Sequence, residues 1–383
     1  MRIIFYSYEY PPLGGGVGNA TKKIFTEFSK LDNLKIDFIT SSISGKYEEE
    51  KVYKNITFYK LPLGKRTKEN YHKQKPLNMI LFSWKAYWKT WSLILKNKYC
   101  LTHFFGFPGG LVSLLFIWKM PYMVSLRGVD VPGYNPRFKY FYIFYKPLSW
   151  VIWKLAKYVV PNSKGLQKLA YKTSKTVNYK VIYNGIDTEQ FKPVEEDKKF
   201  PVFTVTQGGT LFGRKKGLEY LIQGFAYFTK KYSNTKLLMI ASGDLEIEYK
   251  QLVKDLNIED KVEFVGFKEN NWIAENLPKC HVFCLPSLNE GMSNAALEAL
   301  ASGLPLILTD TGGTEELLKY KNGLVVDKKN PKSISNALEK IYLDKELRLK
   351  MNEQSRRRAN EMSWKAVAEE YLNLYQSIAY PSQ

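Results

Sequence analysis

Cysteine and histidine are scarce in this chain. Three residues of each type are spread over 383 positions, without the clustered spacing of a zinc site. An odd number of unclustered cysteines is typical of buried thiols in a reducing compartment. These counts predict no histidine- or cysteine-based metal centre, and they favour a cytoplasmic location.

Long apolar runs are also missing. The two stretches closest to a membrane span are residues 101–118, which contain a Gly109-Gly110 pair, and residues 140–160, which contain three lysines and Pro147. Buried strands and helices explain both stretches better than a spanning helix does. Because the chain passes from Met1 directly into a strand pattern, we also expect no signal peptide.

Two common nucleotide-binding signatures are absent. No stretch has the Gly-x-x-x-x-Gly-Lys-Ser/Thr spacing of an ATPase phosphate loop, and the glycine run 14–18 lacks the Gly-x-Gly-x-x-Gly spacing of a dinucleotide site. No Asp-x-Asp pair is present to hold a metal ion. The sequence therefore argues against an ATPase and against a metal-held diphosphate.

Acidic residues are too few in the first half of the chain to balance the basic ones. Residues 1–196 hold 31 basic and 13 acidic residues, a net charge of +18, whereas residues 197–383 hold 26 and 24, a net charge of +2. A lysine-rich composition alone would raise the charge everywhere. Charge confined to one half implies an anionic partner there, which could be a membrane surface, a nucleic acid or a polyanionic substrate.

What the chain does contain is two similar series of short apolar strands and helices. The predicted strands are residues 2–7, 35–41, 100–104, 122–126, 159–162 and 180–183, and then 202–206, 236–241, 261–265, 281–285, 305–309 and 323–326. Helices are predicted at 18–30 and 217–232, and throughout 341–379. This alternation predicts two parallel sheets with helices on both faces.

The length and the linker pattern divide the chain into two domains. At 383 residues it exceeds what one core usually holds, and the run 187–200 is polar, with five acidic residues and Pro193. We expect an α/β domain over residues 1–196 and a second over 197–360. A last helix, 361–383, is expected to pack back toward the first domain.

Residues 285–298 carry the clearest chemical signal. A strand leads into a turn with Glu290-Gly291, and a helix is predicted to begin near Ser293, with Glu298 in its second turn. Glycine permits close approach of a ligand, and a helix N-terminus suits a phosphate. Carboxylates accept hydrogen bonds from sugar hydroxyls. The stretch predicts a nucleotide-sugar pocket; the alternative is that Glu290 caps the helix and Glu298 is solvated.

An ordered set of motifs resembles the retaining glycosyltransferases of the family 4 type, also called group 1 glycosyltransferases. The motifs are residues 11–16, 181–187 with Phe191, 209–217, 240–243, 264–267, 286–298, and 309–313 with Glu315-Glu316. Each is weak alone, but together and in order they are specific, and they cover almost the whole chain. The resemblance implies the GT-B fold, in which two doubly wound Rossmann-like domains face each other across a cleft.

The resemblance also implies roles for particular residues. Those expected at the donor are Gly15, Gly16, Gly209, Arg214, Lys216, Gly266, Phe267, Glu290, Gly291, Met292, Ser293, Asn294 and Glu298. Glu290 would hold the donor sugar, Glu298 the ribose, and Arg214 with Lys216 the diphosphate. Catalysis would then rest on Glu290, Arg214, Lys216 and Arg127, without metal or cofactor.

Two positions depart from the family pattern. Arg127 stands where many relatives have a histidine that reaches the donor sugar, so it could replace that histidine or bind an anionic group; His103 is a second candidate. The arginine and lysine of the diphosphate site are closer together than in many relatives, which leaves Lys215 and Lys216 both open as the phosphate contact. A solvated loop is the alternative for this basic cluster.

The basic first half contains an aromatic helix and a basic loop. Residues 77–96 place three tryptophans on one predicted helical face, and residues 64–75 before them are rich in lysine and arginine. We expect the tryptophan face to pack on the core and the loop to contact an anionic membrane. A lipid-linked acceptor on the cytoplasmic leaflet would account for such a contact.

The predicted function is transfer of a sugar from a nucleotide-diphosphate sugar to a glycan or lipid-linked acceptor, in the synthesis of cell-surface polysaccharide. Within enzymes, the alternatives are a GT-B nucleotide-sugar epimerase or a phosphorylase. A basic nucleic-acid-binding protein is an alternative from another class, but no RNA- or DNA-binding signature accompanies the charge.

Overall fold

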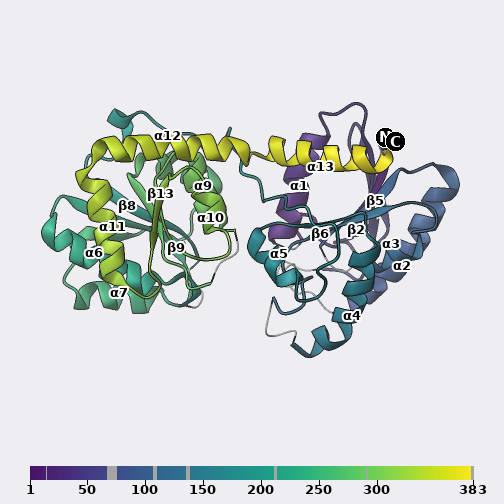
Figure 1. Ribbon diagram of the computed structural model, residues 1–383, viewed down its shortest axis with the longest axis horizontal. Coiled ribbons are helices and arrows are strands. Elements are labelled where there is room, and N and C mark those ends of the chain that lie inside the picture. The colour runs from purple at the N-terminus through teal and green to yellow at the C-terminus, as the bar shows by residue number, and fades with distance from the viewer. Residues whose placement is uncertain are drawn as a thin grey trace. The chain divides into compact units, whose positions relative to one another are not determined.

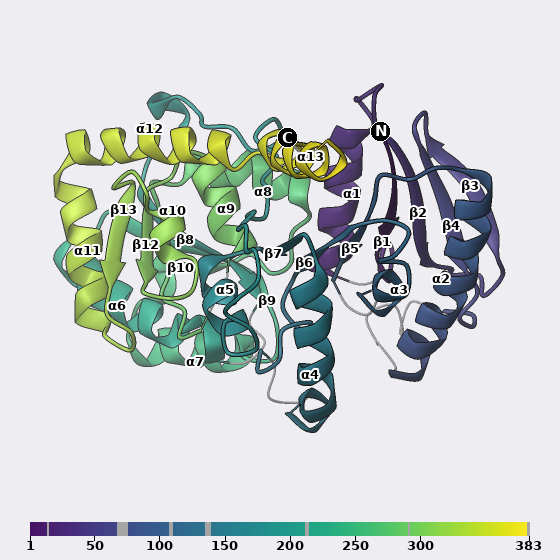
Figure 2. The ribbon, with the colours of Figure 1, turned by 45° about the vertical axis from the view of Figure 1, so that its right-hand side comes forward.

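The computed structural model describes residues 1–13, 15–66, 76–106, 110–134, 139–210, 214–289 and 292–380. The chain forms two compact units (Figures 1 and 2). One comprises Met1–Asn184 together with Trp364–Gln383, and the other comprises Gly185–Ser363.

The first boundary falls earlier in the chain than the one predicted at residue 196. The polar run that begins at 187 is not a free linker, because it packs on the second unit. Phe191 is buried there, Glu196 pairs with Arg348, and Phe200 N donates to Lys279 O at 2.9 Å. The charged residues of this run therefore belong to a segment that lies on the surface of the second unit, and they do not mark a domain boundary.

The first unit is built on a seven-stranded sheet with helices on both faces. The strand order is β3-β4-β2-β1-β5-β6-β7, and only the β3–β4 pair is antiparallel. The strands are β1 (Arg2–Tyr6), β2 (Lys35–Ser41), β3 (Glu48–Tyr53), β4 (Ile56–Leu61), β5 (Leu101–Phe105), β6 (Tyr122–Leu126) and β7 (Tyr158–Pro161). The helices are α1 (Gly16–Phe28), α2 (Pro76–Lys96), α3 (Gly110–Leu115), α4 (Lys139–Leu155), α5 (Lys164–Ala170) and α13 (Trp364–Ala379).

Alternation along the central strand separates two cores. Ile3 and Phe5 of β1 pack with α1 and α13, whereas Ile4 and Tyr6 pack on the other face with α2 and α3. Successive side chains of a strand point to opposite faces, so a strand buried on both faces reads as one continuous apolar run. This is why the central parallel strands were predictable.

Two predictions for this unit were wrong. Residues 180–183 do not form a strand: Tyr179 makes an isolated bridge with Val159, and the chain continues in irregular structure. The β3–β4 hairpin was missed, because β3 is a largely exposed edge strand that carries three glutamates and lacks a buried apolar pattern.

The tryptophan face of α2 was also predicted wrongly. The side chains that α2 buries are Phe82, Ala86, Thr90 and Leu93, whose spacing forms a stripe on another side of the helix. Of the predicted face, only Trp91 packs against the core, while its other members are exposed. Aromatic bulk drew the prediction to the wrong side of the helix.

The second unit is a six-stranded parallel sheet in the order β10-β9-β8-β11-β12-β13. Its strands are β8 (Phe203–Thr210), β9 (Thr235–Ser242), β10 (Val262–Phe264), β11 (Val282–Leu285), β12 (Leu306–Thr309) and β13 (Gly323–Val326). Its helices are α6 (Leu218–Lys231), α7 (Glu246–Asp255), α8 (Asn270–Asn276), α9 (Asn294–Ala301), α10 (Thr314–Leu317), α11 (Pro331–Leu343) and α12 (Lys345–Glu361).

Side-chain caps fix where three of these helices begin. Ser293 caps α9, Asn330 caps α11 with Pro331 at the first helical position, and Asp344 caps α12. Each capping oxygen accepts a hydrogen bond from a first-turn N–H that has no partner inside the helix. The predicted helix start near Ser293 is thereby confirmed.

Candidate functional site

A cavity of about 220 Å³ lies at the carboxyl ends of β8, β9 and β10 in the second unit. It is lined by Gly208, Ile240, Ala241, Gly266, Phe267, Lys268, Asn270, Ile273, Leu277, Phe283, Asn294, Ala295 and Glu298. Four residues predicted at the donor, Gly266, Phe267, Asn294 and Glu298, therefore lie around one cavity. Ligands of open parallel sheets bind at this edge.

The loop after β10 forms one wall of this cavity. Gly266 adopts a φ of +70°, which favours glycine, and a side chain there would meet open space. The neighbouring Phe267 ring is 77% exposed. An exposed aromatic ring beside a cavity offers a flat apolar surface, which is the type of surface on which a nucleobase stacks.

Glu298 supplies the carboxylate of the cavity. It projects from the second turn of α9, and burial raises the pKa of its carboxyl to about 7. None of the described residues donates a hydrogen bond to this carboxylate or forms an ion pair with it. A half-buried carboxylate that has no donor among the described residues is open to accept hydrogen bonds from a ligand.

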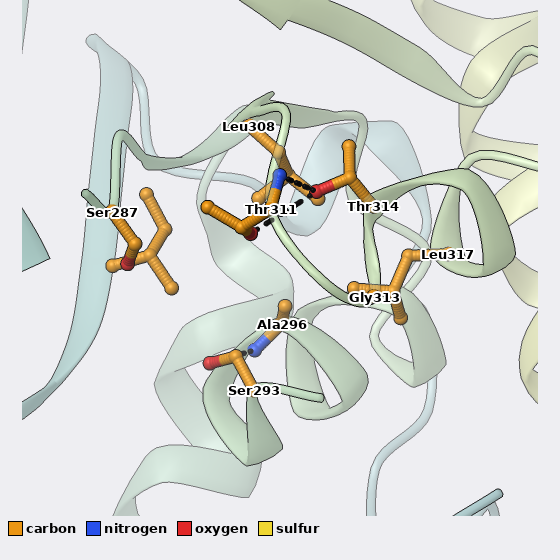
Figure 3. A pocket seen from close by; sticks show the side chains of 9 residues that line it. Ser287, Ser293, Ala296, Leu308, Thr311, Gly313, Thr314 and Leu317 are labelled. Carbon is orange, nitrogen blue, oxygen red and sulfur yellow. Dashed lines mark hydrogen bonds between the residues drawn. The ribbon is translucent and has the colours of Figure 1, made fainter. Parts of the chain in front are cut away.

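The N-terminus of α9 and the turn after β12 line a small hollow. Figure 3 shows Ser293, whose Oγ accepts from Ala296 N, on one side of this hollow, and Thr311 and Thr314, which are joined by hydrogen bonds, on another. Thr314 Oγ1 also donates to Thr309 O at 2.7 Å. The hollow between these groups has a volume of about 10 Å³, so it has room for a water molecule at most. The hollow is therefore too small to hold a sugar or a phosphate.

The loop that carries Arg214, Lys215 and Lys216 is fixed beside the segment that follows β11. Leu288 N donates to Lys215 O at 2.8 Å, and a Cβ on Gly217 would lie 2.2 Å from Pro286 O. The positive φ of Gly217, +63°, requires glycine as well. The predicted diphosphate loop therefore adjoins the predicted sugar loop.

The side chains of the predicted diphosphate pair, Arg214 and Lys216, lie outside the lining of this cavity. The described lining of the cavity includes neither Arg214 nor Lys216. Arg214 is exposed and forms an ion pair with Glu248 at 2.6 Å, and Lys216 is half-buried. Solvent screens the exposed pair, so exchanging Glu248 for a ligand phosphate would cost Arg214 little.

The remaining predicted donor residues are Gly209, Glu290, Gly291 and Met292. Glu290 and Gly291 lie outside the described residues. Gly209 lies on β8, where its backbone pairs with Ala241 of β9. Met292 is half-buried and directly precedes the cap of α9.

A second cavity, of about 260 Å³, lies in the first unit. Its lining consists of Ser7, Tyr8, Glu9, Gly16, Val17, Gly106, Arg127, Val129, Asp130, Tyr134, Asn162 and Asn184. Two predicted residues, Gly16 and Arg127, are among them. Gly15 N donates to Glu9 Oε2 at 3.2 Å, which ties the glycine loop to the cavity wall.

Side chains at the two glycines of this loop would not collide with the rest of the fold. A Cβ added to Gly15 or Gly16 would meet nothing within 4 Å, and neither residue has a positive φ. The space beside both glycines is open, so a ligand could approach the backbone there.

Arg127 is committed to partners inside the first unit. Its guanidinium donates to Asn184 Oδ1 at 2.8 Å and to the Tyr371 hydroxyl at 2.6 Å, and it stacks over the Phe105 ring at 3.8 Å. Burial lowers the pKa of this guanidinium. Arg127 therefore lines the cavity, but two of its N–H groups bind Tyr371 of α13 and Asn184.

His103 belongs to the same buried network and does not line the cavity. Its Nδ1 lies 2.6 Å from the Tyr375 hydroxyl and its Nε2 lies 2.8 Å from Ser125 Oγ. Burial places the pKa of its imidazole well below the ordinary value, so the ring is neutral. The alternative of a satisfied histidine in a strand fits this geometry better than a donor contact does.

Several lining residues were missed as site residues. Lys268 and Asn270 follow the predicted Gly266-Phe267 pair, and a wider window around that pair would have included them. Asn184 lies in a motif that had been noticed, but no sequence signal marks Glu9 or Asn162. Asp130 accepts from the backbone N–H groups of Arg127 and Gly128, and burial raises the pKa of its carboxyl to about 6.

No group of three or more histidine, cysteine, aspartate and glutamate side chains in the described ranges is arranged to hold a metal ion. Within the same part of the chain, no helix has both the length and the apolar character needed to cross a bilayer.

Known proteins share both the sequence and the fold. Residues 186–358 match the family described as glycosyl transferases group 1. Over 408 aligned residues the chain is 26% identical to an uncharacterized glycosyltransferase of Methanocaldococcus jannaschii, with 98% of each chain covered. It is also 29% identical, over 58% of its length and 60% of the relative's, to the N-acetylgalactosamine-N,N'-diacetylbacillosaminyl-diphospho-undecaprenol 4-alpha-N-acetylgalactosaminyltransferase of Campylobacter jejuni.

Solved structures with this fold include a sucrose-phosphate synthase from Thermosynechococcus elongatus, with a TM-score of 0.78, 20% identity and full coverage of both chains. Another is HepE of Anabaena in complex with UDP, with a TM-score of 0.74, 16% identity, and coverage of 98% of this chain and 100% of that one. The fold is GT-B, as predicted. The match of residues 186–358 to a glycosyltransferase family, and the likeness of nearly the whole chain to a glycosyltransferase, support the predicted class of enzyme. Neither an epimerase nor a nucleic-acid-binding protein is supported.

Proposed function

We propose that the protein is a retaining, family 4 type glycosyltransferase that moves a hexosyl group from a nucleotide-diphosphate sugar to a lipid-linked glycan acceptor. The observation that carries the donor class is Glu298, a half-buried carboxylate that receives no hydrogen bond from the described residues and lines a cavity beside the start of α9. Solved neighbours support this donor class, because HepE was determined with UDP and with UDP-glucose.

In this proposal the second unit holds the nucleotide. The base would lie against Phe267 and the backbone at Gly266, and the ribose hydroxyls would donate to Glu298. The diphosphate would lie at the start of α9, near the loop that carries Arg214 and Lys216. The first-turn N–H groups and the positive end of the helix dipole favour negative charge there.

The chemical step breaks the bond between the anomeric carbon and the diphosphate oxygen, and forms a bond from that carbon to an acceptor hydroxyl oxygen. The acceptor proton passes to the departing diphosphate oxygen, which takes up the electron pair of the broken bond. Arg214, Lys216 and backbone N–H groups would stabilise the charge that develops on the diphosphate, which makes the reaction independent of a metal ion. Glu290 would hold the donor sugar during this step.

The acceptor class rests on charge and on one relative. The relative in Campylobacter jejuni is named for an undecaprenol-linked acceptor, which is a lipid-linked glycan. The excess positive charge of residues 1–196 suits the anionic surface on which such an acceptor is embedded. We therefore place the enzyme on the cytoplasmic face of the membrane, in the synthesis of a cell-surface polysaccharide.

A screen of UDP-, GDP- and ADP-sugars by thermal shift tests the donor class. One nucleotide series should raise the melting temperature of the protein, and the corresponding sugar should then be transferred with its anomeric configuration retained, as read by NMR of the product. If no nucleotide-sugar raised the melting temperature, the donor class would be wrong. An inverted product would overturn the retaining mechanism alone.

A further inference from the structure

Helix α2 of the first unit has apolar side chains on two opposite sides. One side packs on the core through Phe82, Ala86 and Leu93. Because an α-helix turns by about 100° per residue, a second apolar stripe lies on the opposite side. We call this stripe the α2 seam; it consists of Leu77, Leu81, Trp84, Trp88, Trp91 and Leu95. Trp91 also packs against the core, whereas the other five seam residues are between 36% and 75% exposed.

The spacing of the α2 seam is that of a helix–helix contact. Its members are separated by four, three, four, three and four residues, which is the alternation of the two apolar positions in a heptad repeat. The solvent side of a surface helix is ordinarily polar. An exposed heptad stripe opposite the buried one therefore fits a second helix that packs along α2.

Helix α3 and the turn after it widen this apolar surface. The ring of Trp118 lies 6.3 Å from that of Trp91, and Leu115 and Trp118 are both more than half exposed. With about 250 Å² for a tryptophan and about 120 Å² for a leucine or isoleucine, the exposed seam residues together with Ile80, Leu115 and Trp118 expose about 800 Å². The largest apolar patch of a monomer is typically about 300–600 Å², and each partner of a stable complex buries about 800 Å². The area thus matches one half of a dimer interface.

The lysines beside the α2 seam are engaged within their own unit. Lys85 Nζ donates to Pro62 O at 2.7 Å, and Lys89 Nζ donates to the Tyr47 hydroxyl at 2.9 Å and lies 3.9 Å from the centre of the Tyr59 ring. Helices at a membrane surface direct such lysines to the lipid phosphates, whereas the centre of a protein–protein interface is depleted of charge. The α2 seam therefore fits an apolar protein surface better than anionic lipid.

The α2 seam is complementary to itself in the antiparallel direction. A two-fold axis at the level of residue 86 would pair Leu77 with Leu95, Leu81 with Trp91, and Trp84 with Trp88 of a second copy. A symmetric dimer needs a self-complementary surface of this kind. Antiparallel pairing also opposes the two helix dipoles and keeps the two exposed Lys96 side chains at opposite ends, whereas parallel pairing would bring like charges together.

We infer that the chain forms a symmetric dimer in which the α2 seams of two copies pack antiparallel, with Leu115 and Trp118 at the edge of the interface. Two copies would bury about 1,600 Å² of apolar surface, which is within the range of stable complexes. The inference goes beyond the proposed function and does not depend on it, because neither donor nor acceptor takes part.

Sedimentation equilibrium of the full chain tests the dimer. The parent should dimerise with a Kd of about 10 μM or tighter, and Leu77→Ser/Leu95→Ser should raise that Kd at least about tenfold. The matched control is Ile247→Ser/Leu343→Ser, which changes two comparably exposed apolar side chains of the second unit and should dimerise like the parent. The dimer should persist or strengthen as salt rises from about 0.1 to 0.5 M, because salt screens the repulsion between two copies of the basic half and leaves apolar contacts intact.

Engineered cysteines test the antiparallel arrangement, and they do not depend on a weakened variant. In a Cys100→Ser background, Leu77→Cys and Leu95→Cys should each remain uncrosslinked alone, because each position lies about 27 Å from its own counterpart in the antiparallel pair. The two proteins should form disulfide-linked dimers when they are mixed and then oxidised. The two remaining cysteines, Cys280 and Cys284, are buried and should not contribute.

Four results would overturn the inference. The parent could stay monomeric up to about 100 μM, the seam variant could dimerise like the parent, or the dimer could dissociate as salt rises. Self-crosslinking of either cysteine variant would overturn the antiparallel arrangement. A monomeric parent whose seam variant loses binding to neutral phosphatidylcholine vesicles would assign the surface to lipid. If the seam variant lacked a cooperative thermal transition, the cysteine pair would decide. UDP binding is measured separately, so failure of the dimer and failure of the donor site are distinguishable.

Discussion

The two cavities differ in how their polar groups are satisfied. In the second unit, the Glu298 carboxylate receives no hydrogen bond from the described residues, and burial raises its pKa to about 7. In the first unit, Arg127 is bonded to Asn184 and Tyr371, and Asp130 accepts from two backbone N–H groups. The polar groups of the second cavity are thus arranged for a ligand, and those of the first also stabilise their own unit. A substitution should therefore affect ligand binding in one unit and stability in the other.

The largest effect is expected at Arg127. In Arg127→Ala the Tyr371 hydroxyl and the Asn184 amide lose a buried donor, so the free energy of unfolding should fall by about 2–3 kcal/mol. Denaturant titration measures this change, and Tyr371→Phe should reproduce part of it. Arg214→Ala is the matched control in the second unit, because its exposed ion pair should contribute little. A parent-like free energy of unfolding in Arg127→Ala would contradict this contrast, because the polar groups of the first cavity would then not stabilise their unit.

The glycine loop should behave differently from Arg127, although it belongs to the same unit. Gly16→Ala should fold with the parent's stability, since a Cβ there meets no atom within 4 Å, and Gly15→Ala is the second loop variant to assay. Transfer activity should still fall about tenfold or more if the donor approaches this backbone, and kinetics with a saturating acceptor measure that loss. Gly217→Ala is the contrast, because its Cβ would collide with Pro286 O and destabilise the second unit. Full activity in both loop variants would remove this loop from the site.

A smaller effect should follow from pH. The folded pKa of Glu298, about 7, lies above its ordinary value of about 4.3, so the stability that the neutral carboxyl contributes is present below about pH 4.3 and is lost as pH rises through about 7. Glu298→Gln removes this titration. The melting temperature of the variant should therefore gain on that of the parent between about pH 5 and pH 8. A constant difference across that range would mean that this carboxyl titrates normally.

The smallest effect is expected from chelation. If Arg214, Lys216 and backbone N–H groups carry the diphosphate charge, excess EDTA should leave the transfer rate of the parent unchanged. Dialysed enzyme assayed with and without EDTA measures this, and added magnesium and manganese are the comparison. Complete loss of activity that either ion restores would assign the diphosphate to a metal.

The two units also differ in how well their structures could be predicted from the sequence. The second unit was read well, because short buried strands, capped helix starts such as Ser293, and glycines at forced turns such as Gly217 are local signals. The edge strand β3 was missed because it is largely exposed and lacks a buried apolar pattern, and residues 180–183 were misread because their apolar side chains resemble a strand although the chain there makes only the isolated bridge between Tyr179 and Val159. The role of Arg127 was invisible, since its partner Tyr371 lies far away in the chain. The exposed face of α2 was predicted to be buried because helical periodicity identifies apolar stripes but does not tell which of two stripes packs on the core.

Calorimetric titration of the nucleoside diphosphates into the parent and into Glu298→Ala tests the central claim most directly. One of UDP, GDP or ADP should bind the parent, and Glu298→Ala should bind it about tenfold more weakly or worse, with a melting temperature no lower than that of the parent. Glu353→Ala, which removes an exposed carboxylate on α12, is the matched control and should bind like the parent. Equal affinity in the parent and Glu298→Ala would contradict the account, because the carboxylate that defines the nucleotide cavity would then have no ligand to hold.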